Sequence, residues 1–367
     1  MRARPRLPKN IQELVHWYER YISPLALVAG FVADSLFLLR RVDLWSSNLL
    51  LLSYLVVAGT GIVIINMLET GRMRSSRLIR IAPIVPVVVQ FAFGGLFSGY
   101  LSLYSRSAAY AVSWLFVLLL AALLIGNERF TRWYSRLSFQ ISLYFGVLFS
   151  FLIFFLPVVL KEIGPVVFIE SGVIALILIS LFIVFLAFLV PERVRASQIK
   201  IVRSLGAIFL GFNLLYFTNA IPPLPLSLRE AGVYHRIVRG DDGYHLLSEP
   251  REWYQAFLNY NTHLHLSPGE PAYVYSSIFA PEDLSTTIVH RWQRYDFAWR
   301  RWITDQTISF PIRGGRDGGY RGYSFNSSIT PGSWRVSVLT EYGQVIARVS
   351  FTVEEVPESP ALEELVR

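Results

Sequence analysis

Residues 138–160, SFQISLYFGVLFSFLIFFLPVVL, and residues 165–190, PVVFIESGVIALILISLFIVFLAFLV, decide the fold of this chain. Together the two stretches contain a single charged side chain, that of Glu170. The apolar core of a bilayer is about 30 Å thick, and about 20 apolar residues in an α-helix cross it. Both stretches are therefore predicted to be transmembrane helices that are joined by a short connection.

Five more apolar stretches extend this pattern toward both sides. They lie near residues 22–39, 45–67, 81–103, 108–126 and 201–220, and the first of them is the shortest. Their connections are brief, as in bundles whose sequence neighbours pack antiparallel. The predicted fold class is thus an α-helical transmembrane bundle of about seven spans, followed by a different kind of domain.

The basic residues of the loops predict the orientation of the bundle, because positively charged loops stay in the cytoplasm. The N-terminal tail and every second connection hold 16 Lys and Arg, whereas the alternate connections hold 4. With an odd number of spans, this asymmetry predicts a cytoplasmic N-terminus and a C-terminal domain outside the cytoplasm. The four residues on the outer side are Arg40, Arg41, Arg106 and Lys161.

Composition agrees with a membrane half and a water-soluble half. The chain of 367 residues is 53% hydrophobic and 16% charged, which is too apolar for a soluble globule of that size. The net charge of +8 comes from the first half, with 20 Lys and Arg against 9 Asp and Glu up to residue 221, and 14 against 17 after it. Because these cations lie in short loops, they do not form the continuous patch that binds nucleic acid.

The chain has no cysteine, which excludes disulfides, thiolate metal sites and cysteine nucleophiles. The N-terminal stretch MRARPRLPKNIQELVHWYERY is long, polar and partly acidic, and no small-residue cleavage pattern follows the first apolar run. We expect that run to be a signal anchor that is retained.

Two ionisable residues, Asp34 and Glu170, lie inside predicted spans. Each is about five residues from the outer end of its helix, so the two carboxyl groups could share a layer of the bundle. One interpretation is a proton or cation site. The other is that both are hydrated or bridged by basic residues at the outer ends. No lysine lies midway along the last span and no histidine lies in any span, so neither retinal nor haem is expected, and we predict no cofactor.

After Ile221 the pattern changes to short alternating segments that are separated by glycine turns. GVYHRIV and YHLLS flank Gly240–Gly243 and predict a hairpin. SWRVSVLT and QVIARVSFTV, on either side of Glu341–Gly343, predict a second one. Several further strands at similar spacing predict an antiparallel sandwich of immunoglobulin-like size.

Particular motifs of this region resemble a known family. They are Val289–Trp292, Gly318–Ser324, Pro331–Val336, Gly343–Val345 and Ala347–Val353. They are similar to the C-terminal domain of bacterial membrane proteins grouped as DUF2914, a domain of unknown function, over about residues 262–355. The layout of the whole chain resembles another bacterial membrane family of unknown function, DUF5924. These resemblances imply a Gram-negative inner membrane and a periplasmic domain, and they bring no catalytic residues.

Aromatic and basic residues of the β-rich region are the candidates for a ligand site, since aromatic faces stack on sugars and guanidinium groups bind anions. The alternative is that they form a β core and its rim. His263 and His265 would share one face of a strand, but no third metal ligand stands at a diagnostic spacing, so no metal site is predicted. No motif of a catalytic nucleophile or a phosphate loop is present. The ligand-site candidates are His290, Arg291, Trp292, Arg321, Tyr323 and Trp334.

The predicted organisation is a cytoplasmic tail (1–21), a seven-helix transmembrane domain (22–220), a linker with a hairpin and a short amphipathic helix (221–260), a periplasmic β-sandwich (261–356) and a flexible tail (357–367). We expect a non-enzymatic inner-membrane protein whose sandwich recognises a periplasmic protein, a glycan or a lipid headgroup. The alternatives are a transporter or membrane-embedded enzyme that uses Asp34 and Glu170, and an accessory subunit of a larger membrane complex.

Overall fold

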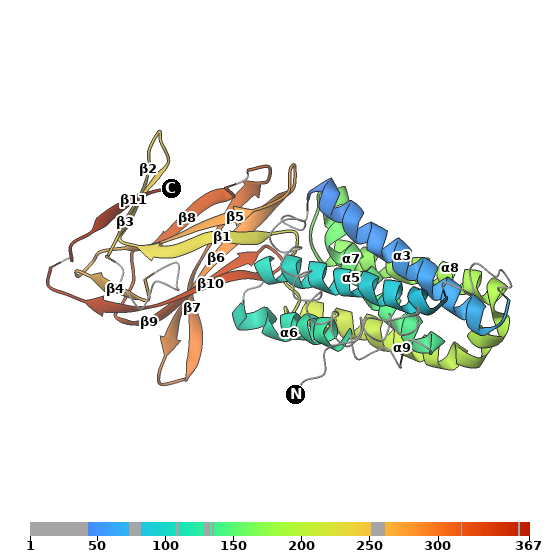
Figure 1. The fold of residues 1–367 in the computed structure, drawn as a ribbon. Coiled ribbons are helices and arrows are strands. Elements are labelled where there is room, and N and C mark those ends of the chain that lie inside the picture. Colours follow the sequence, from blue (N-terminus) through green and yellow to red (C-terminus); the bar gives the residue numbers. More distant parts are fainter. Residues whose placement is uncertain are drawn as a thin grey trace, which may run out of the picture. The chain divides into compact units, whose positions relative to one another are not determined.

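The computed structural model describes residues 43–72, 82–107, 110–127, 133, 136–250, 261–316, 318–358 and 360–367 (Figure 1). The expected cytoplasmic tail, the expected first span with Asp34 and nearly all of the short helix expected at 250–260 lie outside these residues. The chain divides into two compact units. The helical unit lies within Met1–Ser105, Leu115–Val159 and Pro165–Ala220, and the β unit lies within Arg106–Trp114, Leu160–Gly164 and Ile221–Arg367.

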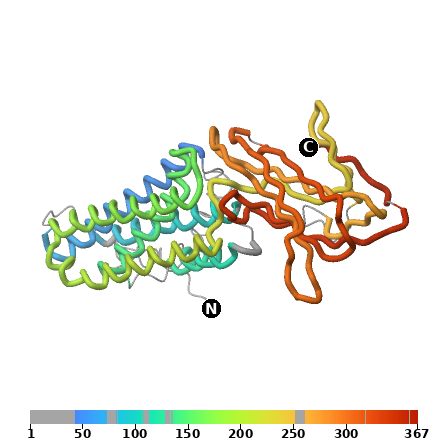
Figure 2. Tube along the Cα trace, turned by 180° about the vertical axis from the view of Figure 1, so that it is seen from behind, coloured from blue at the N-terminus to red at the C-terminus, as the bar shows by residue number. Residues whose placement is uncertain are grey.

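The described residues contain six α-helices (Figures 1 and 2). Five of them are long and apolar enough to cross a membrane, whereas the apolar part of α6 is shorter. A run of apolar helices is confirmed, and the count of seven spans remains a prediction. The helices are α3 (Trp45–Glu69), α5 (Val85–Ser107), α6 (Tyr110–Asn127), α7 (Leu137–Leu160), α8 (Pro165–Leu189) and α9 (Pro191–Phe217), and a short 3-10 helix, η3 (Ala82–Ile84), precedes α5.

Several polar side chains between the helices pair with one another or with backbone carbonyls. Asn66 Nδ2 of α3 donates to Gln140 Oε1 of α7 at 2.6 Å, and Tyr100 OH of α5 donates to Val147 O at 2.7 Å. Such pairing satisfies polar groups that are buried between apolar helices. Glycine lets α3 approach α5 closely, since a Cβ atom on Gly61 would lie 2.1 Å from Val89 Cγ2.

One end of the helical unit is held by contacts between connections that the charge pattern predicts on the same side. Arg193, at the start of α9, forms an ion pair with Glu69 at the end of α3. Arg72 Nη1 donates to Leu189 O at 2.6 Å. The second and sixth predicted connections therefore lie together in the helical unit.

The β unit contains three sheets. All neighbouring strands pair antiparallel except β4 and β10, which are parallel. The three-stranded sheet has the order β1 (Ser227–Tyr234), β5 (Ala272–Phe279) and β8 (Tyr320–Asn326). The five-stranded sheet has the order β4 (His263–Leu266), β10 (Val345–Glu355), β9 (Gly332–Thr340), β6 (Ser285–Asp296) and β7 (Arg301–Arg313). The small sheet has the order β11 (Glu363–Val366), β3 (Tyr244–Ser248) and β2 (Arg236–Arg239).

The three-stranded and five-stranded sheets share a core, because alternate residues of their strands point to the same interior. Val233 of β1 and Val274 of β5 belong to one buried cluster with Trp292, Trp334 and Phe351 of the five-stranded sheet. Trp334 is opposite Phe351 in the register of β9 and β10. A β-rich C-terminal region with packed sheets is thus confirmed.

Both predicted hairpins are present, since β2 pairs with β3 and β9 pairs with β10. The segment GVYHRIV, expected as one strand, is divided at His235 between β1 and β2. β1 lies in the segment that we expected to be a linker, where it pairs with β5 along its whole length. Residues 357–367 were expected to form a flexible tail, but Glu363–Val366 form β11, because Leu365 packs on the apolar cluster under the small sheet.

Candidate functional site

The outward face of the three-stranded sheet is aromatic, and the small sheet covers part of it. Tyr234 and Tyr275 are buried there with Ile237 and Leu246 of the small sheet. The rest of this face, on β8, presents Arg321, Tyr323 and Phe325, because these residues alternate with the core-facing ones. The edge between the covered and uncovered parts is where a ligand has access.

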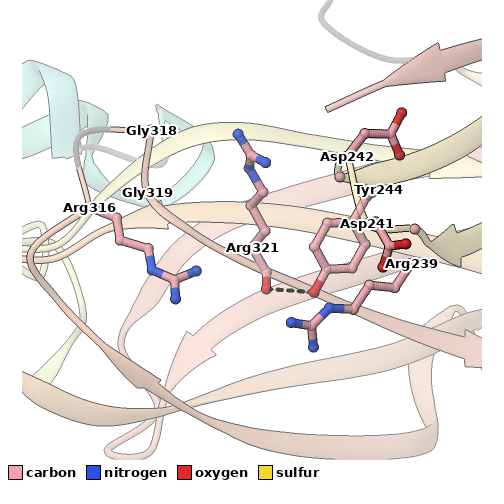
Figure 3. A pocket seen from close by; sticks show the side chains of 10 residues that line it. Arg239, Asp241, Asp242, Tyr244, Arg316, Gly318, Gly319 and Arg321 are labelled. Atoms are coloured by element: carbon pink, nitrogen blue, oxygen red, sulfur yellow. Dashed lines mark hydrogen bonds between the residues drawn. The ribbon is translucent and has the colours of Figure 1, made fainter.

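A cleft of about 380 Å³ opens at this edge, between the β2–β3 turn and the loop before β8. Ligand pockets have volumes of roughly 300–1,000 Å³, so the cleft is large enough for a small molecule or for one group of a larger partner. We call it the arginine cleft. It is lined by Arg239, Gly240, Asp241, Asp242, Gly243, Tyr244, Arg316, Gly318, Gly319 and Arg321 (Figure 3).

Two glycine turns shape the arginine cleft. On one side, Gly240 N donates to Gly243 O at 2.7 Å and closes the β2–β3 turn, in which Gly243 has a φ of +145°. On the other side, Ser277 Oγ of β5 donates to Gly318 O at 2.7 Å. A Cβ atom on Gly319, which has a φ of +82°, would lie 2.6 Å from Ser277 Oγ. The loop therefore needs glycine to lie this close to β5.

Cations dominate the charge of the cleft. In the described part of the chain, none of Arg239, Arg316 and Arg321 forms an ion pair with an acidic side chain. Asp242 is occupied by His245, whose Nε2 lies 2.7 Å from Asp242 Oδ1, and this hydrogen bond lowers the pKa of the Asp242 carboxyl below its ordinary value. Asp241 also lines the cleft, so three guanidinium groups stand beside two carboxylates, one of which is held by His245.

The three arginines do not point the same way. In Figure 3, Arg239 and Arg316 extend from opposite sides toward the space below Tyr244, whereas the Arg321 side chain turns away from them. Tyr244 OH donates to the backbone carbonyl of Arg321 at 3.4 Å and so joins the two walls. Arg239 and Arg316 are therefore the two arginines whose side chains extend toward this space.

Aromatic rings continue the surface beside the cleft. Tyr244 contacts Tyr323 edge to face with ring centroids 6.1 Å apart, and Tyr273 lies 5.5 Å from Phe325. Tyr323 is 37% exposed and Phe325 is 49% exposed. Their outer faces are open to stacking by a sugar or another ring.

The structure separates the six predicted ligand-site residues into three places. Arg321 lines the arginine cleft and Tyr323 lies at its aromatic rim. Arg291 is exposed on the far face of the five-stranded sheet. The other three, His290, Trp292 and Trp334, are buried in the core.

His290 and Trp292 belong to an internal hydrogen-bond network. His290 Nε2 lies 2.8 Å from Ser276 Oγ, and its Nδ1 lies 2.8 Å from Ser324 Oγ. Trp292 Nε1 donates to Ser324 Oγ at 3.0 Å, and Trp334 Nε1 donates to Thr330 O at 2.7 Å. Burial lowers the pKa of His290 to about 3, so the imidazole is neutral. These side chains therefore lie in the interior of the β unit.

The intramembrane candidates and the histidines of β4 form no further site in the described residues. Glu170 is exposed on α8, and Asp34 lies outside the described part of the chain. His263 Nδ1 lies 3.0 Å from Glu354 Oε1, and His265 Nδ1 lies 2.7 Å from Glu249 Oε2. Within the described ranges, no group of three or more potential ligands is placed to hold a metal ion.

The ligand-site candidates predicted from the sequence do not include Arg239, Arg316 or Tyr244. Each is next to a glycine turn, Gly240–Gly243 or Gly318–Gly319, and an arginine beside such a turn was the available signal. The two turns meet because strands that are far apart in the sequence pair with one another. The residues of the turns do not predict this pairing.

Comparison with known proteins identifies one part of the chain. Residues 285–353 match the family described as "Protein of unknown function (DUF2914)", so the predicted similarity of the C-terminal domain is confirmed for this region. None of the curated proteins matches the sequence. Among solved structures, the alkylpurine DNA glycosylase AlkC of Pseudomonas fluorescens, bound to DNA containing an abasic site analog, is 9% identical over 86% of this chain and 99% of its own, with a TM-score of 0.23. A likeness this low carries no argument.

Proposed function

We propose that the chain is a non-enzymatic, multi-pass protein of the bacterial inner membrane whose periplasmic β unit binds an anionic partner in the arginine cleft. One observation carries this proposal. Three guanidinium groups line a cleft of ligand size, and none of them forms an ion pair in the described part of the chain. Unpaired arginines around a concave surface are suited to bidentate binding of carboxylate or phosphate.

The proposed location rests on the distribution of positive charge in the loops. It is supported by the composition of the β unit, which includes residues 160–164 from a predicted outer connection together with residues 221–367. Lys161 Nζ of that connection lies 2.7 Å from Asp283 Oδ2. Connections that pack against the sheets of one compact unit would lie on the same side of the bilayer as those sheets.

The finer architecture is part of the same proposal. Residues 22–39 would supply a first span in addition to α3 and the helices after it, which makes seven. The packed sheets would form a sandwich of immunoglobulin-like size, and the whole chain would have the layout of the DUF5924 family. The five long apolar helices and the DUF2914 match at residues 285–353 support this proposal.

The chemistry of the cleft indicates the class of partner. Arg239 and Arg316 would bind one carboxylate or phosphate group, and the rings of Tyr244 and Tyr323 would contact the body of the ligand. An anionic sugar, free or as part of a glycan, satisfies both requirements.

Calorimetry on the full chain in detergent micelles tests the proposal, with glucuronate and glucose 6-phosphate as charged probes and glucose as the neutral one. We expect the charged sugars to bind and glucose not to bind. Arg239→Gln and Arg316→Gln should each weaken binding by about tenfold or more, because each removes a charge-assisted hydrogen bond.

Arg229→Gln is the matched control. Arg229 is an exposed arginine of β1 whose guanidinium lies 5.1 Å from the ring centroid of Phe279, and it does not line the cleft. Equal loss in the control and in the cleft variants, or equal binding of glucose and the charged sugars, would refute recognition by Arg239 and Arg316.

Transport or catalysis through Asp34 and Glu170, and a role as an accessory subunit, remain the alternative predictions. If Asp34→Asn and Glu170→Gln abolish a transport activity of the reconstituted protein without changing its stability, the bundle is the working part.

A further inference from the structure

The β6–β7 hairpin carries exposed aromatic side chains at its tip. β6 and β7 are the two longest strands of the β unit, and their distal part projects from the sheet in both views (Figures 1 and 2). The tip comprises residues 296–301. Phe297 is 72% exposed and Trp299 is 71% exposed. Large rings so open to water are unfavourable in a free soluble domain and mark a contact surface.

The tip is a built turn. Asp296 Oδ1 accepts hydrogen bonds from the backbone N–H groups of Ala298 at 2.9 Å and Trp299 at 3.0 Å. Tyr295 supports Phe297, with ring centroids 5.0 Å apart, and the guanidinium of Arg301 lies 5.4 Å from the centroid of Trp299. The two exposed rings are thus fixed at the end of the hairpin.

Arginines occupy the outward face of the same sheet, which we call the arginine face and define as Arg291, Arg335 and Arg348. Their sequence neighbours Trp292, Trp334 and Val349 are in the core cluster, so the arginines point outward. In the register of the sheet, Arg291 and Arg348 lie on either side of Ser337.

The charges of the arginine face are not compensated in the described part of the chain, where none of its three members forms an ion pair. Arg348 Nε is buried and has no hydrogen-bond partner there. Burial lowers the pKa of Arg335 to about 10, and the positive charge of Arg348 contributes to this shift. An anion between these side chains would relieve their repulsion.

A chain of contacting aromatic rings connects the arginine face to the tip. The guanidinium of Arg335 lies 4.3 Å from the ring centroid of Trp302, and Trp302 lies 5.2 Å from Tyr295, which supports Phe297. Arg294, Arg300 and Arg301 add exposed cations around the tip, against the single acidic residue Asp296. The hairpin therefore presents rings at its end and guanidinium groups behind them.

We propose that the β6–β7 hairpin docks on the surface of an anionic phospholipid bilayer, with Phe297 and Trp299 in the headgroup region and the arginine face bound to lipid phosphates. Aromatic rings are enriched at the interface between membrane and water, and basic residues near an anionic leaflet are attracted to it. This site is separate from the arginine cleft and does not depend on the ligand proposed there. A bilayer fits better than a soluble anion because the rings and the cations form one continuous surface.

A single-cysteine variant tests the docking, because the chain has no cysteine of its own. Ala298→Cys carries an environment-sensitive dye at the tip, and the full chain is reconstituted in nanodiscs. In one arm, the protein in phosphatidylcholine nanodiscs is mixed with vesicles. These vesicles consist of phosphatidylcholine alone or of phosphatidylcholine with phosphatidylglycerol. In the other arm, phosphatidylglycerol is placed in the nanodisc itself. We expect a blue shift of the dye in at least one arm with phosphatidylglycerol and none with phosphatidylcholine alone.

Two sets of variants separate the contributions of rings and charges. Phe297→Ser with Trp299→Ser should abolish the blue shift. Arg291→Gln, Arg335→Gln and Arg348→Gln should each weaken docking by about fivefold, as expected for the loss of one charge near an anionic surface. Val238→Ser, at an exposed apolar residue of β2, and Arg313→Gln, at an arginine that is paired with Asp283, are the matched controls and should change nothing.

Soluble glycerophosphoglycerol, the free headgroup, distinguishes a lipid surface from a dissolved phosphate. If it binds to the arginine face with the affinity of the vesicles and the tip dye never shifts, bilayer docking is refuted. Docking is also refuted if the emission of the dye shifts in neither arm although the variants unfold at the same temperature as the parent protein. A shift that survives removal of both rings would equally overturn the proposal.

Discussion

His290 is a residue that the sequence indicates as part of a ligand site and that lies in the core of the β unit. It is 0% exposed, it is bonded through both ring nitrogens to serine hydroxyls, and Phe310 packs edge to face on its ring at 5.0 Å. A buried imidazole of this kind is tolerated because all its hydrogen-bonding groups are satisfied, and burial disfavours its charged form.

The low pKa of His290 makes the stability of the β unit depend on pH. The folded protein keeps the imidazole neutral down to a pKa of about 3, whereas the unfolded chain takes up a proton near its ordinary value of 6.5. The unfolded state therefore binds more protons between these values, and stability falls as the pH drops from about 6.5 toward 3. Between pH 7 and pH 5 we expect a loss of about 2 kcal/mol from this residue.

Urea unfolding of the full chain in micelles, followed by tryptophan fluorescence, measures this effect as a difference between the parent protein and His290→Gln. The glutamine amide offers a donor and an acceptor but does not titrate, and the other histidines titrate alike in both proteins. The free energies of unfolding should converge as the pH falls from 7 to 5. Parallel curves would show that His290 is not the group that responds.

Alternation along β6 puts His290 and Trp292 on one face of the strand, but it does not indicate whether that face is buried. Its partners Ser276 and Ser324 are 14 and 34 residues away in the sequence. Whether a row of aromatic and histidine side chains is buried or exposed depends on the distant strands that pack against it. The sequence alone therefore does not distinguish a core position from a surface position. By contrast, Arg321 and Tyr323 alternate with Gly322 and Ser324, and they reach the surface as expected of a ligand site.

Among the elements, β11 has the largest consequence for the proposed site. It pairs with β3 along four residues, and Tyr244 N donates to Arg367 O at 2.9 Å just beyond the strand. Arg367 Nε also lies 2.8 Å from Glu230 Oε1 of β1. The last residues of the chain thus hold the small sheet, and with it Arg239 and Tyr244 of the arginine cleft.

A truncated chain without residues 361–367 should keep the three-stranded and five-stranded sheets and lose the order of the small sheet. Hydrogen exchange of the full-length and truncated proteins in micelles measures this. We expect faster exchange of the β3 amides, because their partners on β11 are removed, and unchanged protection in β6 and β9. Arg367→Gln, which keeps β11 but removes the ion pair with Glu230, should have a smaller effect. If β3 stays as protected in the truncated chain as in the parent, β11 does not support the cleft.

Prediction of elements succeeded where the partner strands are joined by a short turn. The β9–β10 and β2–β3 hairpins follow from alternation and turn residues alone. It missed β11, where EELV shows no clear alternation, and the division of GVYHRIV at His235, whose side chain bonds Glu249 at 2.8 Å. Both features depend on distant partners, and a local pattern does not contain that information.

At the scale of the whole molecule, the two halves obey different solvation rules. The helices satisfy their backbone hydrogen bonds internally, as apolar surroundings require. The β unit instead alternates buried and exposed residues, as water requires on one face of each sheet. This division was readable from the sequence, because apolar runs of 20 residues and alternation of period two are local signals.

Cysteine accessibility in cells tests the proposed arrangement across the membrane, since every introduced cysteine is the sole thiol of the chain. Glu162→Cys and Glu358→Cys lie in the β unit and should react with a membrane-impermeant maleimide in intact spheroplasts. Glu192→Cys, beyond α8, should react only after lysis, because in the proposed arrangement α8 crosses the bilayer between residues 162 and 192. Asn10→Cys should also need lysis and Leu44→Cys should not, if residues 22–39 form the first of seven spans. If Glu192→Cys is labelled from outside and Glu358→Cys is protected, the orientation of the bundle is the reverse of the proposed one. The arginine cleft would then lie in the cytoplasm, where a periplasmic partner could not reach it.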